Sequence, residues 1–108
     1  MFRTDEQHIA CSDCPIAKAA DLMGDSTILL IIRDLRSAPK RFSELTASLP
    51  KVSTRTLTNK LRKLEADDIV DRVQYKKFPP HTEYRLTKKG RGFSPVITAM
   101  KKYGEMYL

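Results

Sequence analysis

The sequence predicts a mainly α-helical chain that carries one small β-hairpin. Leucines spaced four and three residues apart follow Ser53, and this spacing is typical of one face of a helix. Two alternating, β-branched segments at 69–75 and 83–86 flank a turn with two prolines, which indicates a hairpin. The length of 108 residues and the apolar fraction of 41% fit a single domain, 1–108, with one modest core.

Two helices are expected in the first third of the chain. Pro15 suits the first position of a helix, which would continue to Gly24. Asp25 or Ser26 would cap a second helix that runs to about Arg36. Because this second helix contains the longest apolar run of the chain, we expect it at the centre of the core.

A helix–turn–helix is expected at about 43–66. Ser43 is a favourable N-cap for a short helix that ends near Leu49, and a tight turn follows. Ser53 would cap the second helix, which runs to about Ala66.

The helix from Ser53 has the two faces that a DNA-reading helix needs. At about 100° per residue its leucines point inward, while Arg55, Asn59 and Arg62 lie within about 40° of the opposite pole. Arginine can bind guanine through two hydrogen bonds, and asparagine can bind adenine in the same way. No acidic residue occurs at 53–64, whereas ordinary surface helices usually interleave Glu with Lys. We therefore predict binding to double-stranded DNA through Ser53, Thr54, Arg55, Thr58, Asn59, Arg62 and Lys63, together with Lys76 and Lys77 of the hairpin.

The hairpin, at about 69–87, is predicted to form a wing beside this helix. Its tip carries Lys76 and Lys77, and such tips follow the phosphate backbone or enter the minor groove. Phe78 lies in the same turn, and we expect it to pack on the hairpin base. The sequence leaves open which way Arg72 and Arg85 face.

Thr87 would cap a C-terminal helix at about 88–107. Gly90, Gly92 and Pro95 weaken its first turns, so its start is less defined than its end. Its apolar positions exceed what a small winged core can bury.

Positive charge is concentrated in two blocks. The net charge is +7. Residues 33–63 include nine basic and two acidic residues, and residues 70–92 include seven basic and two acidic residues. Residues 1–25 have two basic and five acidic residues. Two basic blocks indicate a polyanion held at two places, and a solvated basic face without a partner is the alternative.

An ordered set of short motifs spans about residues 11–107. The motifs are Cys14-Pro15, Arg41-Phe42-Ser43-Glu44-Leu45, Ser53-x-Arg55-x-Leu57-Thr58, Leu61-Arg62-x-Leu64-Glu65, Pro79-Pro80 and Glu83-Tyr84-x-Leu86-Thr87-x-x-Gly90. In this respect the chain resembles the HxlR-type winged helix–turn–helix regulators, which are relatives of the MarR family. The resemblance implies a homodimeric transcription regulator, a recognition helix at 53–66 and dimerisation through the terminal helices.

Two positions depart from that family pattern. The chain has Gly24-Asp25-Ser26-Thr27 where members usually have Gly-Lys-Trp-Thr, so no role of a Lys-Trp pair carries over. It has Asp68 after the recognition helix, where members usually have Gly. A left-handed backbone there would cost Asp more than Gly.

A dimer is also expected on physical grounds. One recognition helix and one wing cover about half of a DNA site, and specific affinity usually needs two half-sites. We predict a two-fold dimer built from 1–23, which includes an N-terminal arm at 1–14, and from 88–108, acting on a pseudo-palindromic operator. The alternative is that the apolar stripe of the last helix packs on its own domain.

Cys11 and Cys14 form a C-x-x-C with His8 nearby. Zinc needs four ligands and no second cysteine pair exists, and a structural disulfide is disfavoured in the cytoplasm. A redox sensor is the third interpretation, because Cys14 would cap a helix whose dipole stabilises a thiolate. Several members of the resembling family sense oxidants or electrophiles at the position of Cys14. A small half-buried residue at a dimer interface is an equal alternative.

Other function classes find little support. No apolar run approaches the roughly 18 residues of a membrane span, and no secretory signal is present, so a cytoplasmic location is expected. Paired carboxylates, a glycine-rich phosphate loop and a histidine with a motif partner are all lacking, so we expect neither an enzyme nor a cofactor or metal site. The alternative function is a winged-helix module that binds protein or RNA, and the sequence does not identify a small-molecule effector.

Overall fold

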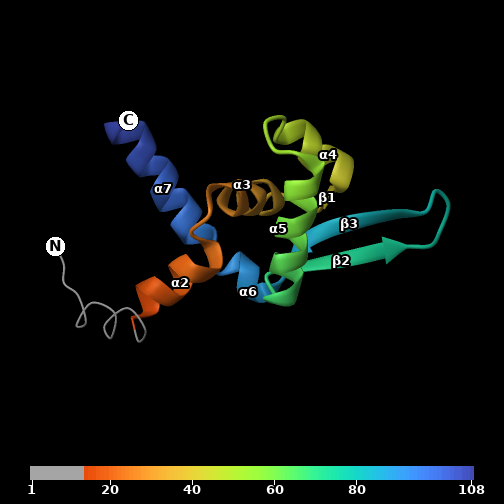
Figure 1. Ribbon diagram of the computed structural model, residues 1–108, viewed down its shortest axis with the longest axis horizontal. Helices are drawn as coiled ribbons and strands as arrows, with labels where there is room; N and C mark the ends of the chain where they lie inside the picture. Colours follow the sequence, from red (N-terminus) through yellow and green to blue (C-terminus); the bar gives the residue numbers. More distant parts are fainter. Residues whose placement is uncertain (1–13) are drawn as a thin grey trace.

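The computed structural model describes residues 14–108, and Cys11, His8 and most of the predicted N-terminal arm therefore lie outside the described part. In chain order the elements are α2 (Pro15–Met23), α3 (Ser26–Leu35), β1 (Lys40–Arg41), α4 (Phe42–Ser48), α5 (Thr54–Ala66), β2 (Val70–Tyr75), β3 (His81–Leu86), α6 (Lys88–Arg91) and α7 (Ser94–Tyr107) (Figure 1). The predicted fold class, mainly α with a small hairpin, is confirmed.

The sheet has three antiparallel strands in the order β1-β3-β2. The hairpin pairs from Val70 opposite Leu86 to Tyr75 opposite His81. The sequence predicted this hairpin but not β1, which pairs Lys40 with Tyr84. A two-residue strand is too short to show alternation, so only its neighbours in space reveal it.

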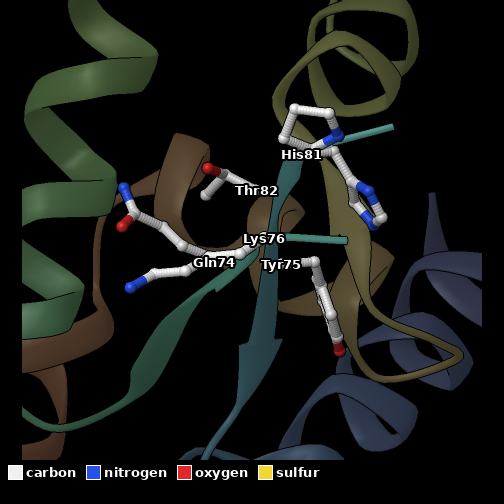
Figure 2. Close-up of a pocket in the computed structure, with 6 residues that line it drawn as sticks. Gln74, Tyr75, Lys76, His81 and Thr82 are labelled. Carbon is white, nitrogen blue, oxygen red and sulfur yellow. The ribbon is translucent and has the colours of Figure 1, made fainter. Parts of the chain in front are cut away.

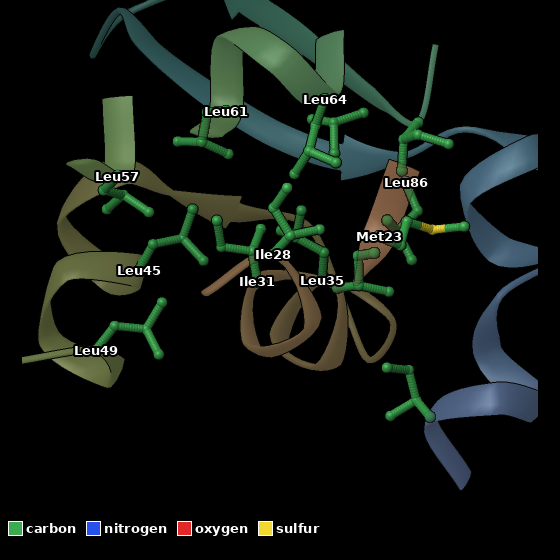
Figure 3. Packing of buried hydrophobic residues seen from close by; sticks show 14 residues of the cluster. Met23, Ile28, Ile31, Leu35, Leu45, Leu49, Leu57, Leu61, Leu64 and Leu86 are labelled. Atoms are coloured by element: carbon green, nitrogen blue, oxygen red, sulfur yellow. The ribbon is translucent and has the colours of Figure 1, made fainter. Parts of the chain in front are cut away.

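The core is built around α3, as the apolar run of that helix predicts. Ile28, Ile31 and Ile32 are almost completely buried. Leucines from α4 and α5 pack against them, and Leu86 closes the cluster from the sheet (Figure 3). The recognition helix α5 is thus held by the same core that organises the whole domain.

Two predicted caps are present. The Asp25 carboxylate accepts a hydrogen bond from the Ile28 N–H at 3.1 Å and starts α3. Ser53 Oγ accepts one from the Thr56 N–H at 3.1 Å and starts α5. Each cap satisfies an amide that would otherwise lack a partner in the first turn.

The prediction that Ser43 caps the short helix is wrong. The N-cap is Arg41, two residues before Ser43, and helix α4 begins at Phe42. The Arg41 N–H donates to Glu44 Oε1 at 2.8 Å, so a carboxylate in the first turn supplies the cap contact. Because Arg41 also belongs to β1, the strand determines where the helix starts.

Asp68, directly after α5, has a positive φ of 61°. The left-handed residue expected from the family pattern is therefore present, although it is not glycine. Its conformation turns the chain from α5 into β2, and the Ile69 N–H donates to the Leu64 carbonyl oxygen at 2.9 Å.

The C-terminal segment forms two helices instead of the single one predicted at 88–107. Thr87 Oγ1 accepts from the Gly90 N–H at 3.0 Å and caps α6, as expected. Helix α6 ends at Arg91, and α7 begins at Ser94 with Pro95 in its first turn. Proline lacks the N–H that a continuous helix would need at this point, so a new helix starts there.

Candidate nucleic-acid interface

The outer face of α5 presents the side chains that were expected to read DNA. Arg55, Asn59 and Arg62 are exposed, and so are Ser53 and Thr54 at the start of the helix. Leu57, Leu61 and Leu64 on the opposite face are at most 1% exposed. Thr58 lies between the two faces and is half-buried. The helix is therefore anchored on one side and open to a ligand on the other.

Two lysines of α5 are already paired with acids. Lys60 Nζ lies 2.9 Å from Asp25 Oδ2, and Lys63 Nζ lies 2.9 Å from Asp67 Oδ2. Lys63 was among the predicted DNA-binding residues. Its pair is an exposed one within the helix, worth about 0.2–1 kcal/mol, so a phosphate can compete for the ammonium. The two arginines of α5 form no ion pair within residues 14–108.

The pair between Asp25 and Lys60 also ties the start of α3 to α5. The hydrogen bond from Lys60, followed by that from the Ile28 backbone N–H, holds the pKa of Asp25 below its usual value of 3.8. A charged link therefore connects the turn between α2 and α3 with the recognition helix.

The wing extends from the domain at the end opposite α2 and α7 (Figure 1). Lys76 and Lys77 are exposed at its tip. Directly below the tip the rings of Tyr75 and His81 stack with centroids 4.8 Å apart, and His81 Nδ1 lies 3.0 Å from the Pro79 carbonyl oxygen. The tip is thus supported by contacts within the hairpin itself.

The expectation that Phe78 packs on the hairpin base is wrong. Its side chain is 94% exposed. Pairing of the strands ends at Tyr75 and His81, and the stack of these two rings occupies the end of the hairpin. Phe78 lies beyond this stack and has no apolar surface to cover it.

The structure decides the orientation of the two strand arginines. Arg85 lies opposite Asp71, with Nε 3.8 Å from Oδ2, on the face away from α5. Arg72 lies on the other face of the hairpin, opposite Tyr84. Because Val70 on that same face is buried in the core, the i, i+2 rule could have placed Arg72 toward α5.

Arg72 and Gln74 thus lie on the side of the hairpin that faces α5, where the sequence alone did not place them. A cavity of about 290 Å³ between α5 and the hairpin is lined by Thr58, Arg62 and Arg72, among others. Figure 2 shows Gln74 on the α5 side of the hairpin and the Tyr75–His81 stack on the opposite side. Helix α5 and the wing therefore meet at a cavity that carries Arg62 and Arg72, with the carboxylate of Glu65 also in its lining.

Cys14 is the N-cap residue of α2, as predicted, and is half-buried. Cys11 and His8 lie outside the described residues, so the C-x-x-C is not described as a unit. Within residues 14–108, no group of three His, Cys, Asp or Glu side chains is arranged to hold a metal ion. No described helix is both long enough and apolar enough to cross a membrane.

A second surface, here called the α2/α7 surface, is apolar. It carries the exposed side chains of Ile16 on α2 and of Val96, Met100 and Tyr107 on α7. An apolar groove of about 480 Å³ runs between the two helices, with Met23 in its wall. Large apolar patches of this kind mark sites of protein association.

A capped basic helix held by a core, with a basic hairpin beside it, defines a winged helix–turn–helix of the DNA-binding class. The model of the HxlR-like helix-turn-helix family matches residues 22–108. The chain belongs to this family, and it is a transcriptional regulator of the HxlR and MarR type.

Individual relatives agree with this assignment. A helix–turn–helix-type transcriptional regulator from Synechocystis sp. is 41% identical over 95 residues, which cover 88% of this chain and 70% of the relative. The transcriptional regulator YodB of Bacillus subtilis is 34% identical over 95 residues, which cover 87% of this chain and 85% of YodB. The reduced form of the redox regulator HypR is similar in structure, with a TM-score of 0.80 and 37% identity over 85% of this chain and 91% of that one.

Proposed function

We propose that this transcriptional regulator binds a pseudo-palindromic operator as a homodimer and that Cys14 makes its DNA affinity depend on oxidants or electrophiles. The observation that carries the proposal is the two-sided character of α5. Three buried leucines hold the helix, while Arg55, Asn59 and Arg62 face outward, and no acidic residue occurs at 53–64. Such a regulator would act in the cytoplasm, beside the DNA.

In this proposal α5 enters the major groove. Arg55 and Arg62 suit bidentate contacts to guanine, and Asn59 suits adenine. Ser53, Thr54 and Thr58 suit phosphates near the start of the helix, and Lys63 would leave Asp67 for a phosphate. Lys76 and Lys77 would hold the backbone at the adjacent groove. Arg72 would add a cation between the helix and the wing.

The dimer would form through the α2/α7 surface. Its exposed apolar side chains support this choice, because a soluble monomer would leave them in water. The surface lies at the end of the molecule opposite the wing (Figure 1). A two-fold axis there would place the two recognition helices on the outer sides of the dimer, as two half-sites require.

Cys14 supplies the regulatory part of the proposal. It lies at the N-terminus of α2, which carries Ile16 of the proposed dimer surface. Oxidation or alkylation there would change the packing of α2 against a partner, with Cys11 as the resolving thiol. Similarity to the redox regulator HypR and to YodB, whose structures include a diamide-treated form, supports this choice.

The test is selection of bound duplexes from a random pool with reduced and with diamide-treated protein. We expect a two-fold symmetric site with half-sites about one helical turn apart, and weaker binding after oxidation. The variant Cys14→Ser should lose the response to diamide and keep the site. Selection of no duplex, or of RNA in preference to DNA, would contradict the proposal.

The base-reading role of α5 is tested by Arg55→Ala. If Arg55 contacts a base edge, affinity for the selected site should fall by about 1–3 kcal/mol and preference at one base pair should relax. Lys76→Ala is the matched control, because loss of a phosphate contact should weaken all sequences alike and lower the salt slope by about one. If Arg55→Ala loses the same affinity for selected and for random DNA, Arg55 contacts only the phosphate backbone.

A further inference from the structure

Phe78 is the most exposed large side chain of the wing. It is 94% exposed, whereas full burial of a phenylalanine is worth about 1.5–3 kcal/mol. The winged core therefore gains nothing from an aromatic residue at this position. A side chain that stabilises neither the fold nor the solubility of the free protein calls for a partner.

The tip that carries Phe78 is well supported. The Tyr75–His81 stack closes the strand pairing just below it, and His81 Nε2 lies 3.4 Å from Glu83 Oε2. The Pro79 carbonyl oxygen contacts His81 Nδ1, and Pro80 follows. These contacts restrain the hairpin on both sides of Phe78, so the chain that presents the ring is held in place before a ligand binds.

The surroundings of Phe78 favour a nucleic acid over a protein. Its sequence neighbours Lys76 and Lys77 are exposed cations, and the next apolar ring, Tyr75, is stacked on His81. A stable protein interface buries about 800 Å² on each partner, with apolar residues grouped at its centre. One isolated ring between lysines and prolines does not provide such a centre, but it suits insertion between stacked bases flanked by phosphates.

We propose that Phe78 is an apolar wedge that enters the DNA minor groove next to the major-groove site of α5 and partly unstacks one base step. Lys76 and Lys77 hold the phosphates on either side of that step. The inference rests on the proposed DNA binding and adds to it a contact that bends or opens the duplex. Apolar side chains inserted in this way kink DNA in other minor-groove binders.

A wedge has a consequence for sequence preference. Pyrimidine–purine steps such as TA unstack readily, whereas A-tracts are stiff. The wing should therefore prefer a flexible step at a fixed distance from the bases read by α5, without any hydrogen bond to that step. Replacing this step by an A-tract should weaken wild-type binding and leave Phe78→Ala almost unaffected.

The experiment compares wild type with Phe78→Ala, Phe78→Leu and Lys77→Ala on two duplexes of about 40 bp, one selected from a random pool by the wild-type protein and one of random sequence at low salt. We expect Phe78→Ala to bind the selected duplex about tenfold more weakly with an unchanged salt slope, since no charge is lost. Phe78→Leu should keep most of the affinity, because leucine also serves as a wedge. Lys77→Ala should lower the salt slope by about one.

The second readout is the fluorescence of 2-aminopurine substituted for single adenines of the duplex. Wild type should raise the signal at one step beside the half-site, and Phe78→Ala should not. Because Phe78 is exposed, the variants should melt with wild type, which separates a lost contact from a lost fold.

Each of the following results would overturn the wedge. If Phe78→Ala binds within about twofold of wild type and gives the same 2-aminopurine signal, the wing contacts only the phosphate backbone of the DNA. A change in the sedimentation of DNA-free Phe78→Ala would assign the ring to contact between copies of the chain. If wild type selects no duplex from the random pool, the proposed function fails as well. If Arg55→Ala weakens binding and Phe78→Ala does not, only the wedge fails.

Discussion

Helices α5 and α7 have nearly the same length, 13 and 14 residues, and both carry an apolar stripe. The stripe of α5 is buried completely by its own chain. On α7 only Ile97 is buried, while Met100 and Tyr107 remain 48% and 67% exposed. An apolar stripe therefore predicts burial against something, but not whether the partner is the same chain or another one.

The contacts of the two helices differ in the same way. Helix α5 packs on α3 and on the hairpin through three leucines. Helix α7 is held near its start, where Arg36 Nη1 donates to the Ser94 carbonyl oxygen at 3.1 Å and to Thr98 Oγ1 at 2.8 Å. Its C-terminal part extends away from the domain (Figure 1). One helix completes the fold of the monomer, and the other is available to join two copies.

The largest expected effect is on the α5 side of this comparison. Leu61→Ala removes a side chain that is 1% exposed and leaves a cavity beside α3, so the free energy of unfolding should fall by about 2–5 kcal/mol. Denaturant unfolding measures this loss at a fixed protein concentration. The exposed Thr54 offers a control, since Thr54→Ala should change the stability by less than about 0.5 kcal/mol. A small loss at Leu61 would mean that α5 is not anchored by the core.

On the α7 side the expected effect is on association. Met100→Lys places a charge on the α2/α7 surface, which a monomer tolerates because the site is half exposed. In a dimer the charge would be buried without a partner, and the dimer dissociation constant should rise about a hundredfold. Sedimentation velocity over a concentration series measures the change. Lys101→Ala, on the exposed side of α7, should leave the dimer intact, and an equally intact dimer with Met100→Lys would show that α7 is not the interface.

The smallest expected effect is on the ion pair between Asp25, at the start of α3, and Lys60 of α5. Because Lys60 and the Ile28 N–H lower the pKa of Asp25 in the folded protein, the pair stabilises the fold fully above about pH 4. This contribution is lost as the pH falls through the lowered pKa. Asp25→Asn keeps a favourable N-cap and removes the charge, so it should cost about 0.2–1 kcal/mol at neutral pH.

Urea unfolding at several pH values measures this effect. The cost of Asp25→Asn should shrink on acidification, when the wild-type carboxylate becomes protonated as well. Asp21→Asn, at an exposed position without an ion pair in residues 14–108, is the matched control. A cost that is constant between neutral and strongly acidic pH would mean that the ion pair between Asp25 and Lys60 does not contribute to the stability.

Much of the site could be predicted from local sequence. The caps at Asp25 and Ser53, the left-handed turn at Asp68 and the outward face of α5 all follow from patterns within one turn of helix or one loop. The misplaced cap at Ser43 and the division of the last helix had another cause. The helix start near Ser43 was decided by strand β1, which depends on pairing with the distant β3. The division before Pro95 has a local cause, the missing N–H of proline, which the sequence analysis took only as a weakening of the first turns.

The sequence by itself determined that the helix from Ser53 has an outward basic face, because the spacing of three leucines leaves Arg55, Asn59 and Arg62 together on the side away from the core. The family membership follows from the ordered set of short motifs between about residues 11 and 107. Only the tertiary structure decided that Arg72 lies beside α5, that Phe78 is exposed at the wing tip, and that residues 14–108 leave most apolar side chains of α7 exposed. Helical periodicity is a property of neighbouring residues, whereas exposure depends on what the rest of the chain brings close.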